Sequence, residues 1–238
     1  LIGRHEVTYA DWIAWLEALP EAARGPLLPR TGAKAFIAGP DFGLTPAPGG
    51  RWRFRFRRAD HVYEALDGEP ITYRDRDRRQ VQDWRRFPVA GVSYEDGLAY
   101  AAWLDATGRV PGAHLCTDVE WERAARGADG RRYPNGARLA PDDANIDETY
   151  GRQTLAFGPD EVGAHPASRS PFDLDDMTGN AWEWVSSSVS LRESVARGGG
   201  YYHTERSGAV VNRLESEPSA RNPMIGMRLC ATWRGPAE

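Results

Sequence analysis

Apolar residues recur at helical spacing near the start of the chain. Four of them lie at positions i, i+3, i+4 and i+7, which predicts one buried face on a helix over residues 9–19. Thr8 is a suitable N-cap with Asp11 three residues later, and Pro20 ends the helix. The apolar residues of this face are Trp12, Trp15, Leu16 and Leu19.

Two further helices are predicted from their capping signals. A capping box at residues 93–96 begins a helix that runs to about Leu104. A second capping box at residues 117–120 begins a helix that Gly127 ends. The residues of the first of these helices that we expect to face the core are Tyr94, Leu98, Ala101 and Ala102.

Residues 51–57 alternate strictly between arginine and an aromatic residue, which predicts a β-strand. A basic and aromatic face also occurs in nucleic-acid-binding proteins. Because the two residue types point to opposite sides of a strand, we favour a half-buried strand with a solvated arginine face. Residues 74–79 mix Asp with Arg and are expected to form a solvated turn, and residues 128–171 are expected to form loops with apolar anchors.

Composition narrows the class of protein. The chain has 238 residues, of which 41% are hydrophobic and 9 are Trp, and this suffices for one domain with a sizeable core. A net charge of −4 gives no case for a nucleic-acid partner. No run approaches the length of a membrane-spanning helix, so no membrane partner is expected. The first residues are not typical of a signal peptide, and we expect the chain to begin inside a longer protein.

The chain has two cysteines, Cys116 and Cys230, which is too few for a disulfide scaffold. Apolar residues flank each of them, so each is expected to be a buried, reduced thiol. A cytoplasmic location is the default that follows from reduced thiols. Display as part of a larger protein is the alternative.

Several short motifs occur in a fixed order along the chain. The most specific is the run Asp176–Trp184, which contains Gly-Asn-Ala-Trp-Glu-Trp. The others are Glu6–Thr8, Pro88–Asp96, His114–Gly127, Tyr133–Gly136, Arg197–Tyr201 and Gly226–Arg228. Together these motifs resemble the formylglycine-generating-enzyme, or sulfatase-modifying-factor, family.

The resemblance implies an α+β fold, namely a C-type lectin fold of the formylglycine-generating-enzyme-like type. Such a fold has short helices around small antiparallel sheets and much irregular structure. The resemblance covers residues 1–238 as a single domain, with a variable-type binding segment at about residues 197–230. The segment is similar to two non-catalytic groups: domains fused to bacterial serine/threonine kinases, and variable proteins of diversity-generating retroelements.

In copper-using members of the family, two cysteines follow the Arg-Gly-Gly turn and bind the metal. At those positions this chain has His203 and Gly208. Because a thiolate pair is what binds this soft metal, we expect no catalytic residue and favour a protein that is not an enzyme. The alternative is a metal-dependent oxidoreductase with iron or copper, an unknown substrate and His203 as a ligand. The family's usual disulfide partner of Cys230 would fall near residues 101–102, so that bond is expected to be missing.

The family also implies a structural calcium ion in the loop that contains the Gly-Asn-Ala-Trp-Glu-Trp run. Two side chains and two backbone carbonyls would supply oxygen ligands, which is the ligand type that calcium takes. The alternative is a purely structural turn in which Glu183 pairs with an arginine. The implied ligands are the side chains of Asp176 and Glu183 and the carbonyl oxygens of Gly179 and Ala181.

The segment after the Arg-Gly-Gly turn is polar and aromatic with small residues interleaved, a composition typical of adaptable binding surfaces. The leading hypothesis is a non-catalytic module that binds an unknown protein or small-molecule ligand. The alternative for this segment is an ordinary solvated loop with weak Arg–Glu pairs. The residues expected to contact the ligand are Tyr202, His203, Glu205, Arg206, Arg213, Glu215 and Asn222.

Overall fold

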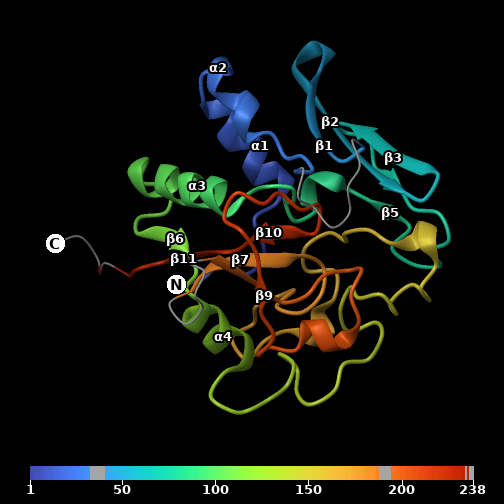
Figure 1. Ribbon diagram of the computed structural model, residues 1–238, viewed down its shortest axis with the longest axis vertical. Helices are drawn as coiled ribbons and strands as arrows, with labels where there is room; N and C mark the ends of the chain where they lie inside the picture. Colours follow the sequence, from blue (N-terminus) through green and yellow to red (C-terminus); the bar gives the residue numbers. More distant parts are fainter. Residues whose placement is uncertain (33–40, 188–193, 234, 236–238) are drawn as a thin grey trace.

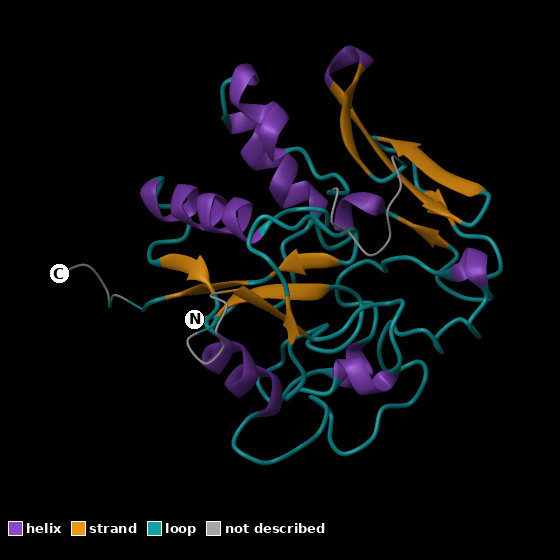
Figure 2. Ribbon diagram, viewed as in Figure 1, coloured by secondary structure: helices purple, strands orange, loops and turns teal. Residues whose placement is uncertain are grey.

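The computed structural model describes residues 1–32, 41–187, 194–233 and 235. Helices lie on two sides of a group of central strands, with α1 and α3 on one side and α4 on the other (Figure 1). Loops make up much of the rest of the fold (Figure 2). The α-helices are α1 (Tyr9–Ala18), α2 (Glu21–Arg24), α3 (Tyr94–Ala106) and α4 (Asp118–Arg126). The 3-10 helices are η1 (Gly25–Leu27), η2 (Pro48–Gly50), η3 (Trp84–Arg86), η4 (Thr154–Ala156), η5 (Pro166–Ser168) and η6 (Glu205–Gly208).

The strands form four small sheets. The central sheet has the order β10-β7-β8-β9, in which β10 and β7 are parallel and the other pairs are antiparallel. Its strands are β7 (Trp182–Ser186), β8 (Ser194–Arg197), β9 (Leu214–Glu215) and β10 (Ile225–Met227). The others, all antiparallel, are β1 (Gly43–Ala47) with β2 (Arg51–Arg58) and β3 (His61–Leu66), β4 (Ile71–Thr72) with β5 (Val81–Gln82), and β6 (Ala113–Leu115) with β11 (Leu229–Ala231).

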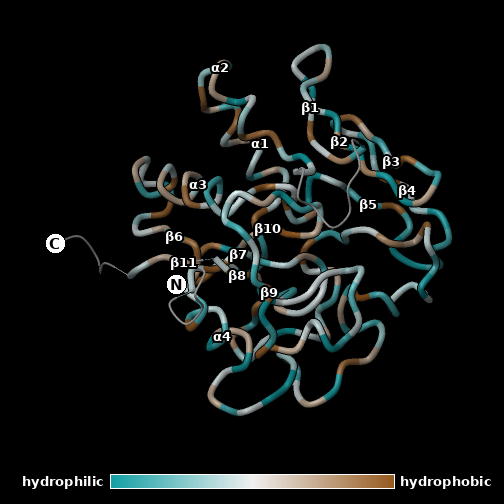
Figure 3. Tube along the Cα trace, viewed as in Figure 1, coloured by the Kyte–Doolittle hydropathy of each residue, from teal (hydrophilic) through white to brown (hydrophobic). Residues whose placement is uncertain are grey.

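The predicted helix starts are confirmed. The side chains of Thr8, Ser93 and Thr117 each accept a hydrogen bond from the third backbone N–H of the helix that follows, and an acidic side chain closes each capping box. The helices place hydrophobic residues next to the central strands, as the brown stretches on β10 and on the neighbouring parts of α1 and α3 show (Figure 3). Three of the four residues expected on the buried face of α1 are buried, and the fourth, Leu19, is the C-cap and only partly buried.

For two of the residues expected to face the core on α3, the prediction is wrong. Leu98 is 43% exposed and Ala102 is exposed, whereas Tyr94 and Ala101 are buried. The buried face instead passes through Gly97, where an added Cβ would lie about 3.1–3.2 Å from side-chain atoms of Leu115 and Met227. A glycine has no hydrophobicity of its own, so a pattern of apolar residues does not mark it as a packing position.

The alternating strand β2 is confirmed as half-buried. Trp52, Phe54 and Phe56 are buried, while the arginines between them lie on the solvent side and pair with Asp41, Glu64 and Glu69. The arginine face is therefore a set of partly exposed ion pairs of low individual value.

The expectation of two reduced thiols is wrong. Cys116 and Cys230 are both buried, as expected, but they form a disulfide bond. Antiparallel pairing of β11 with β6, in which Cys230 faces His114, brings the two sulfur atoms together. The family-based expectation placed the usual partner of Cys230 on α3, and the actual partner, Cys116, directly follows β6. The argument from reduced thiols to a reducing compartment therefore no longer holds.

Within the described ranges, no helix is long and apolar enough to cross a bilayer.

Candidate functional site

A glycine-closed turn follows β8 and presents the sequence-predicted binding segment. Gly198 and Gly199 have φ angles of 93° and 78°, a region that favours glycine. A Cβ on Gly199 would lie 2.9 Å from the backbone nitrogen of Gly208, so the two ends of residues 199–208 touch. Tyr201 is buried at the base of the turn, where its hydroxyl accepts a hydrogen bond from Arg58.

Four of the predicted contact residues lie together on this turn. The Tyr202 side chain is 49% exposed, and its ring centroid lies 4.7 Å from that of Phe157. Glu205 and Arg206 begin the 3-10 helix η6, with Arg206 exposed and Glu205 partly exposed. The fourth residue, His203, lies between them. We call residues 202–206 the turn ridge.

His203 connects the turn ridge to the fold. The indole Nε1–H of Trp182 donates to His203 Nδ1 at 3.3 Å, and the His203 carbonyl accepts a hydrogen bond from the Asp147 backbone at 3.1 Å. Burial lowers the pKa of His203, in agreement with a neutral ring whose Nδ1 accepts. This side chain therefore orients the ridge and leaves Tyr202, Glu205 and Arg206 as its outward groups.

The other three predicted contact residues lie elsewhere. Arg213 is on the α4 side of the fold, and Glu215 is the exposed end of β9. Asn222 is buried: its Oδ1 accepts a hydrogen bond from the Met224 backbone at 3.0 Å, and its carbonyl accepts one from Gly91. Of the seven residues, four thus lie on the turn ridge, two lie at separate surface positions, and Asn222 is buried and bonds the backbone.

A network of two arginines and two carboxylates holds the segment against α4. Arg197 is fully buried and bonds Asp118 and Glu122, and Arg213 bonds the same two carboxylates at 2.7 Å and 2.9 Å. Arg197 also donates to the Val210 carbonyl. Because α4 supplies both acids, this network fixes the position of the binding segment relative to α4. The guanidinium nitrogens of Arg213 that a ligand would contact are already bonded to these acids.

The positions of the family's cysteine pair are structurally unlike a metal site here. A Cβ on Gly208 would lie 2.3 Å from Thr178 Oγ1, which itself donates to the Gly208 carbonyl at 2.8 Å. A side chain at residue 208 therefore fits only if the Thr178 hydroxyl moves. His203, at the other position, is held by Trp182.

The implied calcium loop has the tight backbone that its sequence suggests. Asp176, Gly179 and Asn180 all have φ angles between 58° and 78°, and a Cβ on Gly179 would lie 2.5 Å from the Asn145 carbonyl oxygen. Asp176 is buried, and its Oδ2 accepts a hydrogen bond from the Gly163 backbone at 2.6 Å. Burial raises the pKa of Asp176 to about 6.

Of the two implied side-chain ligands, Glu183 is already paired with an arginine. Both oxygens of Glu183 bond the guanidinium of Arg228, at 2.9 Å and 3.0 Å, and one also accepts from the Trp121 indole at 2.7 Å. Glu183 and Arg228 are fully buried, so a guanidinium already balances this carboxylate. A structural calcium stays a prediction, and the arginine pairing considered as its alternative is present at Glu183.

A second buried cluster of charged residues, which no sequence motif predicted, centres on Asp160. Its Oδ1 bonds Arg76 at 2.6 Å, and its Oδ2 bonds Tyr150 at 2.6 Å and His165 at 2.7 Å. The expectation that residues 74–79 are solvated is therefore wrong at Arg76, whose side chain is fully buried. The charge of this arginine, with the two hydrogen bonds, outweighs burial and lowers the pKa of Asp160.

His165 faces an acceptor on each ring nitrogen. Nδ1 lies 3.0 Å from the Asp142 carbonyl, and Nε2 lies 2.7 Å from Asp160. Only the protonated ring donates at both nitrogens. Burial alone would lower the pKa of His165, but the hydrogen bond and charge of Asp160 outweigh it and raise the pKa.

Replacing His165 with Gln is expected to lower the free energy of unfolding more at about pH 5.5 than at about pH 8.5. A raised pKa in the folded state gives stability that is full below the unfolded pKa of about 6.5 and is lost as the pH rises through the folded pKa. Urea unfolding of wild type and variant at both pH values measures this. His61→Gln is the control with a small loss at both, and an equal loss for His165→Gln at both would refute the protonated ring.

The chain is similar to a known protein family and to several known proteins. The family model described as "Sulfatase-modifying factor enzyme 1-like domain" matches residues 1–233. A protein of Bos taurus, "Inactive C-alpha-formylglycine-generating enzyme 2", is 31% identical over 169 residues, which are 65% of this chain and 53% of that protein. The "Hercynine oxygenase" of Mycobacterium tuberculosis is 39% identical over 152 residues, which are 57% of this chain and 32% of that protein. The match thus spans about half of the first relative and about a third of the second.

Among solved structures, "Treponema denticola variable protein 1" matches with a TM-score of 0.61 and 17% identity, over 97% of this chain and 84% of that chain. At this identity the likeness concerns the fold alone. The expected α+β fold, a C-type lectin fold of the formylglycine-generating-enzyme-like type, is confirmed.

Proposed function

Because the chain belongs to the sulfatase-modifying factor enzyme 1-like family and has His203 and Gly208 at the positions of the cysteine pair, we propose that it is a non-catalytic binding module. Its ligand is a protein or a small molecule, held on the turn ridge. The packing of the Thr178 hydroxyl against Gly208 supports a change of role at these positions, since a cysteine at residue 208 would require that hydroxyl to move.

The observation that carries this proposal is the separation of anchoring from outward residues in one turn. Tyr201, His203 and the glycines hold the turn, while Tyr202, Glu205 and Arg206 project from it. Tyrosine and arginine are enriched among the residues that dominate binding energy, and Tyr202 already rests on Phe157. Contact with a partner therefore requires little additional ordering of the ridge.

Tyr202→Ala and Arg206→Ala are each expected to weaken ligand binding at least tenfold, which corresponds to about 1.4 kcal/mol. Panning a random peptide library on the folded protein supplies defined probes, and calorimetry gives the dissociation constant of each recovered peptide. Arg53→Ala, on the solvent face of β2, is the matched control that leaves affinity unchanged. Peptides that bind the ridge variants as tightly as wild type would count against the ridge as the binding surface.

Within this function, we propose more narrowly that the chain is the variable protein of a diversity-generating retroelement. The fold shared with a variable protein of Treponema denticola supports this, as does a ridge whose exposed positions can change without disturbing its anchors. Substitutions among close natural variants are then expected at residues 202, 205 and 206 and not at residues 198–201. A neighbouring reverse-transcriptase gene with a near-copy of the coding region for residues 197–230 is the genomic test.

A metal-dependent oxidoreductase is the second candidate, and the 39% identity to a hercynine oxygenase over 152 residues favours it. His203 would be one ligand of the metal. Among the described residues, no group of three or more His, Cys, Asp or Glu side chains could hold a metal, so further ligands would have to come from elsewhere. Metal content by plasma mass spectrometry, with oxygen consumption on hercynine and a thiol, separates the candidates. Stoichiometric iron or copper with turnover supports the oxidoreductase and overturns the binding module.

A further inference from the structure

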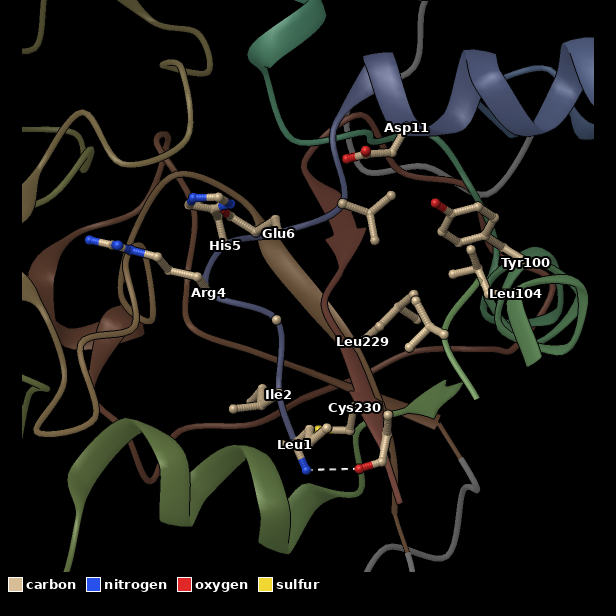
Figure 4. Close-up of a pocket in the computed structure, with 14 residues that line it drawn as sticks. Leu1, Ile2, Arg4, His5, Glu6, Asp11, Tyr100, Leu104, Leu229 and Cys230 are labelled. Carbon is tan, nitrogen blue, oxygen red and sulfur yellow. Dashed lines mark hydrogen bonds between the residues drawn. The ribbon is translucent and has the colours of Figure 1, made fainter. Parts of the chain in front are cut away.

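A pocket of about 430 Å³ opens between the N-terminal segment and α3 (Figure 4). This volume is in the range of small-molecule sites, which are mostly apolar with a few well-placed polar groups. The described residues that line it include none from the turn ridge and none from the loop around Asp176, so this is a separate site. Its apolar lining includes Val7, Leu104, Val110, Leu229 and Ala231.

The wall that α3 supplies is rigid and ends in a hydroxyl group. Tyr100 is buried, and its ring centroid lies 5.3 Å from those of both Trp12 and Trp15. This aromatic cluster fixes the position of the Tyr100 ring. In Figure 4 the Tyr100 hydroxyl points from α3 toward the side of the pocket where Asp11 lies. Burial and the charge of Asp11 raise the pKa of Tyr100, so the hydroxyl keeps its proton at neutral pH.

Asp11 is the carboxylate at the hydroxyl end of the pocket. Its Oδ2 accepts hydrogen bonds from the backbone N–H and the hydroxyl of Thr8, at 2.9 Å and 2.6 Å. Because the capping box uses Oδ2 for both bonds, it leaves Oδ1 for a further donor. These bonds also hold the carboxylate in place, which reduces the cost of ordering it around a ligand. Glu6, the other acid near the N-terminal segment, turns toward His5 and away from Tyr100 in Figure 4.

Among the described lining residues, the basic groups leave this end of the pocket free for a cation. Arg4 is bonded to Asp175 at 2.9 Å. Burial lowers the pKa of His5, so this histidine is neutral at neutral pH. The Leu1 backbone nitrogen lies at the opposite end of the pocket in Figure 4, where it donates to the Ala231 carbonyl at 2.8 Å. The charge at the hydroxyl end is therefore complementary to a positively charged ligand group.

We propose that this pocket binds a small organic amine with an apolar body. The protonated amino group donates to Asp11 Oδ1 and to the Tyr100 hydroxyl oxygen, both of which are acceptors for a charge-assisted hydrogen bond. The body of the ligand covers the apolar side chains of Leu104 and Leu229 and removes them from water. This inference does not depend on the binding function proposed above, because it concerns a different surface of the fold.

The test is calorimetric titration with 2-phenylethylammonium chloride, and with 2-phenylethanol as a probe that has the same body without the charge. Wild type is expected to bind the ammonium probe with a dissociation constant below about 1 mM and the alcohol about fivefold more weakly. Asp11→Asn and Tyr100→Phe are each expected to weaken binding of the ammonium probe about fivefold, since each removes one contact with the charged group. Both variants are expected to leave binding of the alcohol nearly unchanged.

Glu120→Gln is the matched control for the change at Asp11. Its Oε2 accepts the same two hydrogen bonds, from the backbone and hydroxyl of Thr117, in the capping box of α4. This variant weakens a helix cap outside the pocket and is expected to keep full affinity for the ammonium probe. A loss of affinity at Asp11 with none at Glu120 therefore reports the ligand contact and not the cap.

Three outcomes overturn the proposal. Ammonium and alcohol probes that both fail to bind exclude the site, and equal affinity for the two excludes a charged contact. Full affinity in both Asp11→Asn and Tyr100→Phe places the ligand elsewhere. If Asp11→Asn does not fold, Val110→Trp is measured instead, because it puts a large side chain at the rim of the pocket and is expected to weaken binding. Val119→Trp, at an exposed position on α4, is its control, and equal affinity in these two variants overturns the proposal.

Discussion

Arg228→Met is expected to lower the free energy of unfolding by about 3–5 kcal/mol. The Arg228 side chain is fully buried and donates to both oxygens of Glu183, to the Gly3 carbonyl at 3.0 Å and to the Asp175 carbonyl at 2.7 Å. Methionine fills similar space but leaves Glu183 buried, and the Trp121 indole is then its one remaining donor among the residues that the structure describes. Urea unfolding at 25 °C measures the loss.

The size of that loss comes from the partner that is left behind. Arg228→Met with Glu183→Leu removes both charges, so the double variant is expected to recover part of the stability. Arg86→Met, which breaks an exposed pair with Glu161, is the control and is expected to change stability by less than about 1 kcal/mol. A single variant at Arg228 as mild as the control would mean that the interior is wet enough to solvate Glu183.

The local elements could be predicted from the sequence because their signals are local. Each capping box spans four residues, and each determined a helix start correctly at Thr8, Ser93 and Thr117. The alternation in residues 51–57 likewise determined which side of β2 is buried. The buried face of α3 was partly missed, because Gly97 packs by its small size and not by its hydrophobicity.

The charged interior could not be predicted from spacing. Arg76 reaches Asp160 across 84 positions of the chain, and the Asp and Arg repeats around it favoured a solvated turn. Glu6 lies in a short motif that gives no hint of its burial. Only the fold shows which acids have partners, since a partner can come from any part of the chain.

In the binding segment, too, local features could be predicted from the sequence and long-range contacts could not. Composition predicted seven contact residues, of which four lie within residues 202–206 on one turn, and their role in binding stays a prediction. Asparagine is a common residue at binding surfaces, but Asn222 is buried and bonds the backbone. Arg213 is exposed in part, but its guanidinium is paired with Asp118 and Glu122. Residue type indicates which atoms are available, whereas burial and competing partners determine whether they are free.

Cys116→Ala with Cys230→Ala is expected to lower the free energy of unfolding by about 4–5 kcal/mol under non-reducing conditions. The two cysteines are 114 positions apart, so the bond restricts a large loop in the unfolded chain. Both are buried in the small apolar cluster that includes Trp121 and Val185, and alanine also leaves a small cavity there.

Thiol counts and reduced protein distinguish the bond from its packing. Wild type unfolded without reductant is expected to show no free thiol, and two after reduction. Reduced wild type should approach the stability of the double alanine variant, with any remaining difference due to the lost sulfur atoms. Two free thiols in unreduced protein would restore the earlier expectation of reduced cysteines and with it the argument for a reducing compartment. No free thiol, with the expected loss of stability, would make the link between β6 and β11 the strongest covalent constraint on the C-terminal segment that carries the turn ridge.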